Sequence, residues 1–255
     1  MSTAPGAAKQ EDGEAGVSLP SVEDSLELTL LPFVLSVIAG TADVISFLGL
    51  GGLFTAHITG NLVILAAHLA TGGAGQFATI ATMLSVPVFM AALLLTKLFA
   101  LGLESLRIAT LRPLLFLHFL LLSGFLAVAV AAGPQAAPDA FHIVVAGMLG
   151  VSAMAVQNAL AQISIRGAPA TAVMTTNVVN FVIDATTLLA ASDDDERRHA
   201  ASRTKRTWPA IVGFAMGCAL GAAVQAAVGL WSLAGPAGLA LLALALAARS
   251  GVAPR

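Results

Sequence analysis

The polar stretch TAHITGNLV, residues 55–63, occurs a second time in this chain as TAVMTTNVV, residues 171–179. Thr, Ala, Thr, Asn and Val recur at the same spacing without a gap, and both copies lie in strongly apolar surroundings. An amide without a hydrogen-bond partner in such surroundings costs roughly 2–7 kcal/mol. Two interpretations are open: the Asn residues join helices to one another, or they bind a ligand, because polar groups inside membranes are often functional.

The composition predicts a protein embedded in a membrane. The chain has 255 residues, of which 58% are hydrophobic and only 10% are charged, whereas a soluble domain is about 25% charged. The net charge of -2 gives no reason to expect a nucleic-acid partner. There is one cysteine, Cys218, and no Cys/His cluster with zinc spacing. We therefore expect an all-α polytopic membrane protein without a metal or another cofactor.

Eight apolar segments follow a polar tail of 27 residues, which carries six acidic residues and one Lys. They are 28–50, 53–70, 78–103, 113–132, 141–163, 171–191, 208–230 and 233–248. A helix needs about 20 apolar residues to cross a bilayer, and most of the segments have that length. The second and sixth segments carry the repeated stretch and are the least convincing spans, because they also contain His68 and Asp184.

The basic residues predict how many segments cross, because cytoplasmic loops are enriched in Lys and Arg. Basic residues follow the third segment (Arg107, Arg112), the sixth (Arg197, Arg198, Arg203, Lys205, Arg206) and the eighth (Arg249, Arg255). Three segments separate the first two groups, and this odd number means that one of them, best the sixth, does not cross. By the repeat, the second does not cross either.

Six spans and two re-entrant or broken segments then form two pseudo-symmetric halves of three spans each. An odd number of spans per half inverts one half relative to the other, a recurring transporter design. The predicted divisions are a tail at 1–27, repeats at 28–132 and 133–248, and a second tail at 249–255. If the loop after the third segment is external, eight full spans in parallel repeats remain as the alternative.

Two pairs of short sequences resemble the YoaK-type family of bacterial membrane proteins, which is catalogued as a domain of unknown function. They are GTADVISFL (40–48) with FTAHITGN (54–61), and MAVQNA (154–159) with TTN (175–177). The family usually has Thr-Gly in the second copy, where this chain has Thr175 and Thr176. The resemblance implies a multi-pass protein of a bacterial inner membrane, and it implies no substrate or activity.

Candidate proton-coupling residues are Asp43, His57 and Asp184. The two acids are the only ones well inside apolar segments, where a charge costs about 2.5–3.5 kcal/mol on insertion scales. His57 could carry a proton near pH 7. The alternatives are acids that only hydrogen-bond neighbouring Thr or Asn, and a structural histidine. Candidate solute-binding residues near the midplane come from both repeats: Thr59, Asn61, Thr175, Asn177, Gln157 and Asn158.

These residues favour a secondary transporter of a small molecule or ion, with proton coupling through Asp43. A non-transporting membrane scaffold or sensor is the second hypothesis. An intramembrane enzyme is the third and we expect none, because no nucleophile and base motif is present. Both termini are expected in the cytoplasm. Gly213, Gly217 and Gly221 form one smooth helix face, which packs either in the core or against a second copy in a homodimer.

Overall fold

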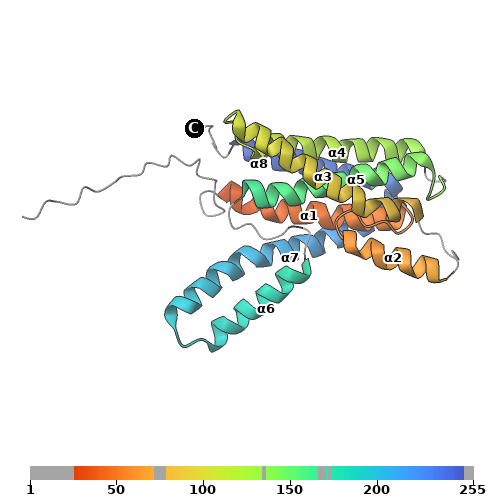
Figure 1. Ribbon diagram of the computed structural model, residues 1–255. Coiled ribbons are helices and arrows are strands. Elements are labelled where there is room, and N and C mark those ends of the chain that lie inside the picture. The colour runs from red at the N-terminus through yellow and green to blue at the C-terminus, as the bar shows by residue number, and fades with distance from the viewer. Residues whose placement is uncertain (1–25, 72–78, 134–135, 166–170, 172–173, 250–255) are drawn as a thin grey trace, which may run out of the picture.

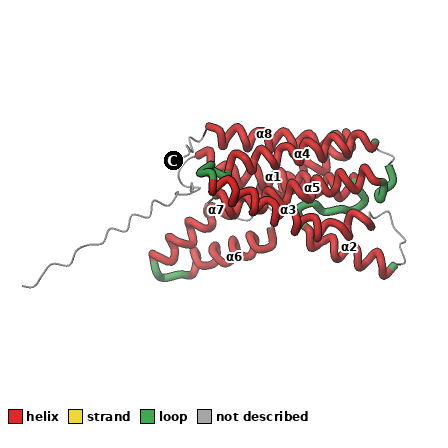
Figure 2. Tube along the Cα trace, turned by 45° about the horizontal axis from the view of Figure 1, so that its top comes forward, coloured by secondary structure: helices red, strands yellow, loops and turns green. Residues whose placement is uncertain are grey.

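The computed structural model describes residues 26–71, 79–133, 136–165, 171 and 174–249, and nearly all of them are helical (Figure 1, Figure 2). The elements are α1 (Leu26–Gly49), α2 (Ile58–Ala70), α3 (Thr79–Ser105), α4 (Leu111–Ala132), α5 (Phe141–Ser164), α6 (Met174–Ala190), α7 (Asp194–Val228), the 3-10 helix η1 (Gly229–Leu233) and α8 (Ala234–Arg249). No strand occurs among the described residues, so the all-α prediction is confirmed.

Five helical segments of the described chain are long and apolar enough to cross a membrane. They are Leu30–Gly49, Thr79–Ser105, Leu111–Ala132, Phe141–Ser164 and Asp194–Arg249. The last one turns back at η1 and so contains two legs, α7 and α8 (Figure 1). Gly229 begins this turn with a φ of 59°, a left-handed conformation that glycine adopts without strain. The polytopic prediction is therefore confirmed.

The two helices that carry the repeated stretch are short. α2 has 13 residues and α6 has 17, which at a rise of about 1.5 Å per residue gives about 20 and 26 Å, against a hydrocarbon core of about 30 Å. Both begin partway along the bundle and run toward its opposite ends (Figure 1). The chain returns from the end of α1 through residues 50–57 before α2 starts. Neither helix is among those long and apolar enough to cross a membrane, and that the two segments are re-entrant stays a prediction.

The helices pair in a pattern that stays the same when the two halves of the chain are exchanged. α1 packs on α7 and α8, and α5 packs correspondingly on α3 and α4. Likewise α2 packs on α3 while α6 packs on α7, and α4 packs on α8. In Figure 1 the colours show that α1 and α5 run in opposite directions along the bundle.

Glycines bring α1 and α7 into backbone contact. A Cβ atom added to Gly217 would lie 2.3 Å from the Val37 carbonyl oxygen, and one added to Gly40 would lie 2.3 Å from the Phe214 carbonyl oxygen. Gly213 and Gly221 meet Phe33 and Thr41 of α1 in the same way. The smooth glycine face is therefore occupied within the chain. α1 of the same chain fills the close approach that the glycines allow, and the formation of a homodimer stays a prediction.

The corresponding contact between α3 and α5 is more open. A groove of about 620 Å³ lies along it, lined on the α3 side by Ile80 and Leu84 and on the α5 side by residues that include Val145, Met148 and Ser152. Asp139, just before α5, closes one end and accepts a hydrogen bond from the Ile80 amide at 2.9 Å. The two equivalent helix contacts thus differ in how tightly they are packed.

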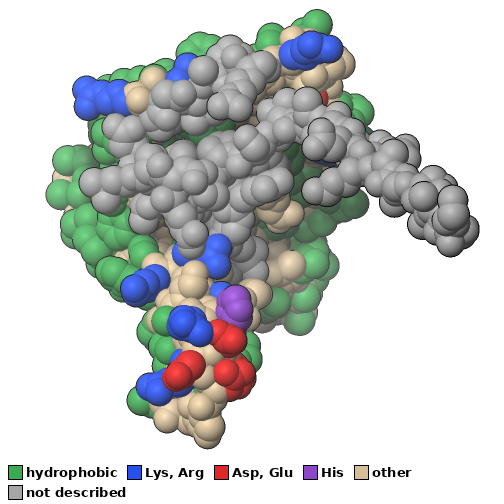
Figure 3. Space-filling view, turned by 90° about the vertical axis from the view of Figure 1, so that its left-hand side faces the viewer, with side chains coloured by type: hydrophobic (Ala, Val, Ile, Leu, Met, Phe, Trp, Pro, Cys, Tyr) green, Lys and Arg blue, Asp and Glu red, His purple; other side chains and the backbone are tan. Residues whose placement is uncertain are grey.

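The connections that carry the Lys and Arg residues, after α3 and after α6, lie at one end of the bundle. α3 and α6 both finish at the end where α4 and α7 begin (Figure 1), so an even number of crossings separates them, as the charge pattern predicts. The view onto this end shows Lys and Arg side chains at its edges (Figure 3). α1 begins and α8 finishes at the same end (Figure 1).

Candidate functional site

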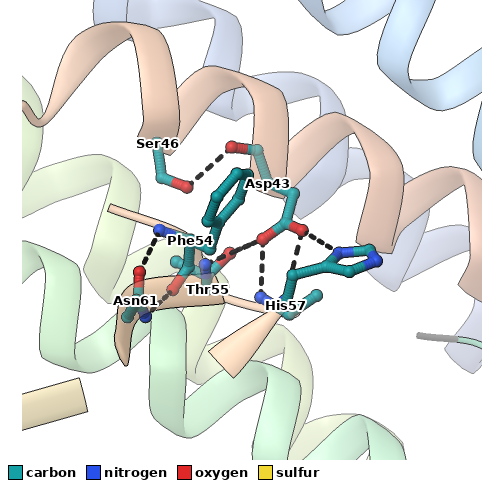
Figure 4. Close-up of polar contacts among 7 residues, drawn as sticks. Asp43, Ser46, Phe54, Thr55, His57 and Asn61 are labelled. Carbon is teal, nitrogen blue, oxygen red and sulfur yellow. Dashed lines mark hydrogen bonds and ion pairs between the residues drawn. The ribbon is translucent and has the colours of Figure 1, made fainter. Parts of the chain in front are cut away.

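Asp43 lies at the centre of the first break between helices. Its side chain projects from α1 toward the connection that leads to α2, and the residue is only 3% exposed. The carboxylate accepts hydrogen bonds from three successive backbone amides, those of Thr55 at 2.8 Å, Ala56 at 2.6 Å and His57 at 3.2 Å (Figure 4). It thereby holds the connection against α1 and supplies acceptors for amides just before α2, where a helix start favours negative charge.

His57 completes a pair with Asp43. Its Nδ1 atom lies 2.5 Å from Asp43 Oδ2 (Figure 4). Since a carboxylate can only accept, the proton between the two atoms belongs to Nδ1 unless Asp43 itself is protonated. The ring makes edge contacts with Phe54 and Phe214, at centroid distances of 6.1 and 5.2 Å. The His57 side chain is 37% exposed, so it links the buried carboxylate to the surface of the bundle.

Asn61 acts on the connection itself. Its Oδ1 atom accepts from the Phe54 amide at 2.9 Å and its Nδ2 atom donates to the Phe54 carbonyl at 2.8 Å (Figure 4). Gly60 makes room for the Phe54 ring, which would lie 2.9 Å from an added Cβ. The Thr-Gly-Asn stretch therefore positions the chain before α2. In this conformation the Asn61 amide binds backbone, and Thr59 beside it is exposed.

Gln157 is the counterpart of Asp43 in the second half. Thr55 Oγ1 donates to Asp43 Oδ1 at 3.3 Å, and Gln157 Nε2 donates to Thr171 Oγ1 at 3.0 Å, so each residue contacts the first Thr of its own copy. Asn158, the other candidate, donates to the Met154 carbonyl of its own helix at 2.9 Å. The register that aligns Asp43 with Gln157 also pairs three identical residues upstream: Leu35 with Leu149, Val37 with Val151, and Ala39 with Ala153.

The two candidate solute-binding residues of α6 lie on different faces of the helix. Asn177 is buried on α6, while Thr175 is exposed. That Asn61 and Asn177 face each other across a central site stays a prediction, because α2 and α6 pack on different helices, α3 and α7.

Asp184 forms an ion pair with Arg203. The guanidinium of Arg203, on α7, donates to Asp184 Oδ1 from Nε at 2.9 Å and from Nη2 at 2.6 Å. His68 occupies the matching place in the first half, seven residues after the motif Asn, and its Nε2 atom lies 3.0 Å from Thr79 Oγ1 of α3. Both residues tie a short helix to the next helix. The ion pair with Arg203 explains why an acid is buried at position 184. The role of Asp184 in proton coupling stays a prediction.

Sequence reasoning missed several partners of these residues. Phe214, one of the two rings beside His57, lies on α7 far along the sequence. Arg203, the partner of Asp184, lies on the helix that follows α6. The Leu35 carbonyl, which accepts from Gln157 Nε2 at 2.9 Å, is a backbone group and carries no sequence signal. Among the described residues, no group of three or more His, Cys, Asp or Glu side chains could hold a metal ion.

Comparison with known proteins gives a family and no activity. Residues 31–246 match the family described as "Protein of unknown function (DUF1275)", and the chain belongs to that family. The resemblance to an uncharacterised YoaK-type family is therefore confirmed. No curated protein and no solved structure matches the chain.

Proposed function

We propose that this member of an uncharacterised family is a secondary transporter of a small solute, in which Asp43 and His57 bind the proton that drives transport. The observation that carries the proposal is the Asp43–His57 pair at the start of a half-length helix inside an apolar bundle. Burial of a carboxylate at this depth is unfavourable, and an imidazole that reaches the surface gives a proton a route to it.

The arrangement of the halves supports a carrier. α1 and α5 run in opposite directions, and each is followed by a short helix that starts within the bundle (Figure 1). Inverted repeats with interrupted helices near the midplane are a common basis of alternating access. Thr59 and Thr175 lie exposed in the first turns of α2 and α6. They are the candidates for direct solute contact, while Asn61, Gln157, Asn158 and Asn177 shape the site.

The charge distribution sets the proposed orientation. Basic connections and both ends of the described chain lie at one end of the bundle (Figure 1, Figure 3). By the positive-inside rule, we propose that this end faces the cytoplasm and that both termini lie on that side of a bacterial inner membrane. A carrier is proposed in preference to an enzyme, because the duplication of the Thr-x-Asn stretch in two pseudo-symmetric halves fits a carrier better.

Transport by the purified protein in liposomes tests the proposal. A thermal-shift screen selects solutes, and uptake of the best one is then driven by a pH gradient. Asp43→Asn should abolish gradient-driven uptake, and His57→Gln should slow it. Asp139→Asn is the matched control, because Asp139 also accepts a backbone amide at a helix start but lies outside the site. Undiminished uptake in Asp43→Asn would refute proton coupling, and a protein that moves no solute of the panel would favour the scaffold or sensor.

A further inference from the structure

Gln157 joins the two halves of the protein directly. Besides its bond to Thr171, its amide nitrogen donates to the Leu35 carbonyl of α1 at 2.9 Å. The side chain is fully buried, and its Oε1 atom has no hydrogen-bond partner among the described residues. A buried amide with an unused acceptor is unfavourable, so the bond to α1 holds Gln157 in a place that does not satisfy it completely.

The repeat predicts a mirrored bond that the present conformation lacks. Leu149 of α5 stands where Leu35 stands in α1, so the counterpart of the Gln157–Leu35 bond would join Asp43 to the Leu149 carbonyl. An ionised carboxylate has no proton to donate and cannot make this bond. A protonated carboxyl has one O–H donor, and a helical carbonyl has a second lone pair to receive it.

We propose that protonated Asp43 donates to the Leu149 carbonyl in a second conformation, in which the connection of residues 50–57 leaves its present place. The bond transfers no atom, because the proton that Asp43 has taken up stays on its carboxyl group. Its part in transport rests on the proposed function, whereas the switch itself does not. In the present conformation, Gln157 makes the bond between α1 and α5. In the second conformation, protonated Asp43 makes the corresponding bond.

The connection must move because it lies between the two partners of the mirrored bond. Thr55 contacts Asp43 on one side, and on the other its Cγ2 atom would be 2.8 Å from a Cβ on Gly150, the residue after Leu149. Leu53 lies against Gly147 in the same way, at 2.5 Å. Protonation weakens the acceptor that holds the amides of residues 55–57, and the connection loses its main attachment to α1.

Few titratable groups face Asp43, so the switch has a simple proton source. His57 in the connection is in direct contact with the carboxylate, and Cys218 on α7 is near enough to be influenced by its charge. α5 carries only His142, in its first turn far from Gln157. A proton that reaches the exposed His57 ring can pass from Nδ1 to Oδ2, which neutralises the carboxylate and leaves the imidazole neutral.

Thiol labelling of the connection tests the switch without any solute. In a Cys218→Ser background, Leu53→Cys reports on the connection, because Leu53 is fully buried where it is now. Adding Asp43→Asn supplies a permanent neutral donor. We expect it to raise the maleimide labelling rate of Cys at 53 by about tenfold or more, as when a minor state becomes dominant. Ala240→Cys on α8, equally buried, is the control and should not change.

A second measurement covers the case in which Asp43→Asn does not fold. With Asp43 intact, labelling at position 53 is compared at about pH 5 and about pH 8, relative to position 240, which removes the pH dependence of thiol chemistry itself. We expect the ratio to rise at the lower pH and the rise to vanish in His57→Gln. A constant ratio overturns the switch, whether or not uptake depends on Asp43. A rising ratio in a protein that moves no solute would refute transport and leave the switch in place.

Discussion

Two helix contacts correspond when the halves of this protein are exchanged, but they are built differently. Between α1 and α7, Gly40 and Gly217 bring the two backbones together, and Thr41 Oγ1 donates to the Gly217 carbonyl at 3.1 Å. Between α3 and α5, the helices are separated by larger side chains and leave a groove of about 620 Å³.

The difference shows which of the two helix contacts can rearrange. Separating α1 from α7 would break backbone contacts that no side chain can replace, and close packing of small residues is the main source of helix association in membranes. Against α5, by contrast, the connection places the flexible side chain of Leu53 at Gly147, and this side chain can change rotamer. We therefore expect α1 and α7 to stay fixed, while the connection of residues 50–57 rearranges against α5.

The largest expected effect is that of a side chain in the α1–α7 contact. Gly217→Leu would force atoms into the Val37 carbonyl, and because the obstacle is backbone, we expect a loss of more than about 3 kcal/mol in the free energy of unfolding. Gly102→Ala on α3 is the control, since no atom lies within 4 Å of its added Cβ; it should stabilise the helix by about 0.5–1 kcal/mol. Thermal unfolding in detergent measures both, and equal stability of the two variants would contradict the close contact.

A smaller effect is expected where the short helices attach. Arg203→Leu leaves the Asp184 carboxylate without the ion pair that holds α6 on α7, while His68→Leu removes a hydrogen bond to the Thr79 hydroxyl of α3, which carries no charge. Arg203→Leu should therefore lower the unfolding temperature more. Arg198→Leu is the control, because its pair with Asp195 is exposed and such pairs contribute little. A larger drop in His68→Leu would show that α2 is the more firmly held of the two.

Much of this fold could be predicted from the sequence. Apolar segments of about 20 residues predict spanning helices. The basic residues predict that the connections after α3 and after α6 lie on one side, and both connections lie at the same end of the bundle (Figure 1). The repeated stretch predicts two short helices, and they have 13 and 17 residues. These properties follow from hydrophobicity and charge summed over many residues, so no single contact decides them.

The partners of individual residues could not be predicted in the same way. Glycines at every fourth position of α7 predict a close contact, but the sequence does not say whether α1 or a second copy makes it. The sequence makes Asn61 a candidate for solute binding, but it carries no signal for the bonds of Asn61 to the Phe54 peptide seven residues earlier. Such choices depend on where a backbone carbonyl or amide lies after folding, and backbone groups are the same in every residue.

The smallest expected effect lies in the contact between α5 and the connection. Gly147→Ala places a Cβ 2.5 Å from Leu53 Cδ2, and because that atom is the end of a flexible side chain, we expect a loss of only about 1 kcal/mol. Leu53→Ala removes the side chain that the new Cβ would meet, and so should remove this penalty. The double variant should therefore lose less free energy of unfolding than the two single variants together, by about 0.5 kcal/mol or more. Thermal unfolding of the four proteins gives the coupling. Additive changes would mean that Leu53 has already moved away from α5 in the membrane, and the contrast with the fixed α1–α7 contact would then be larger than the structure suggests.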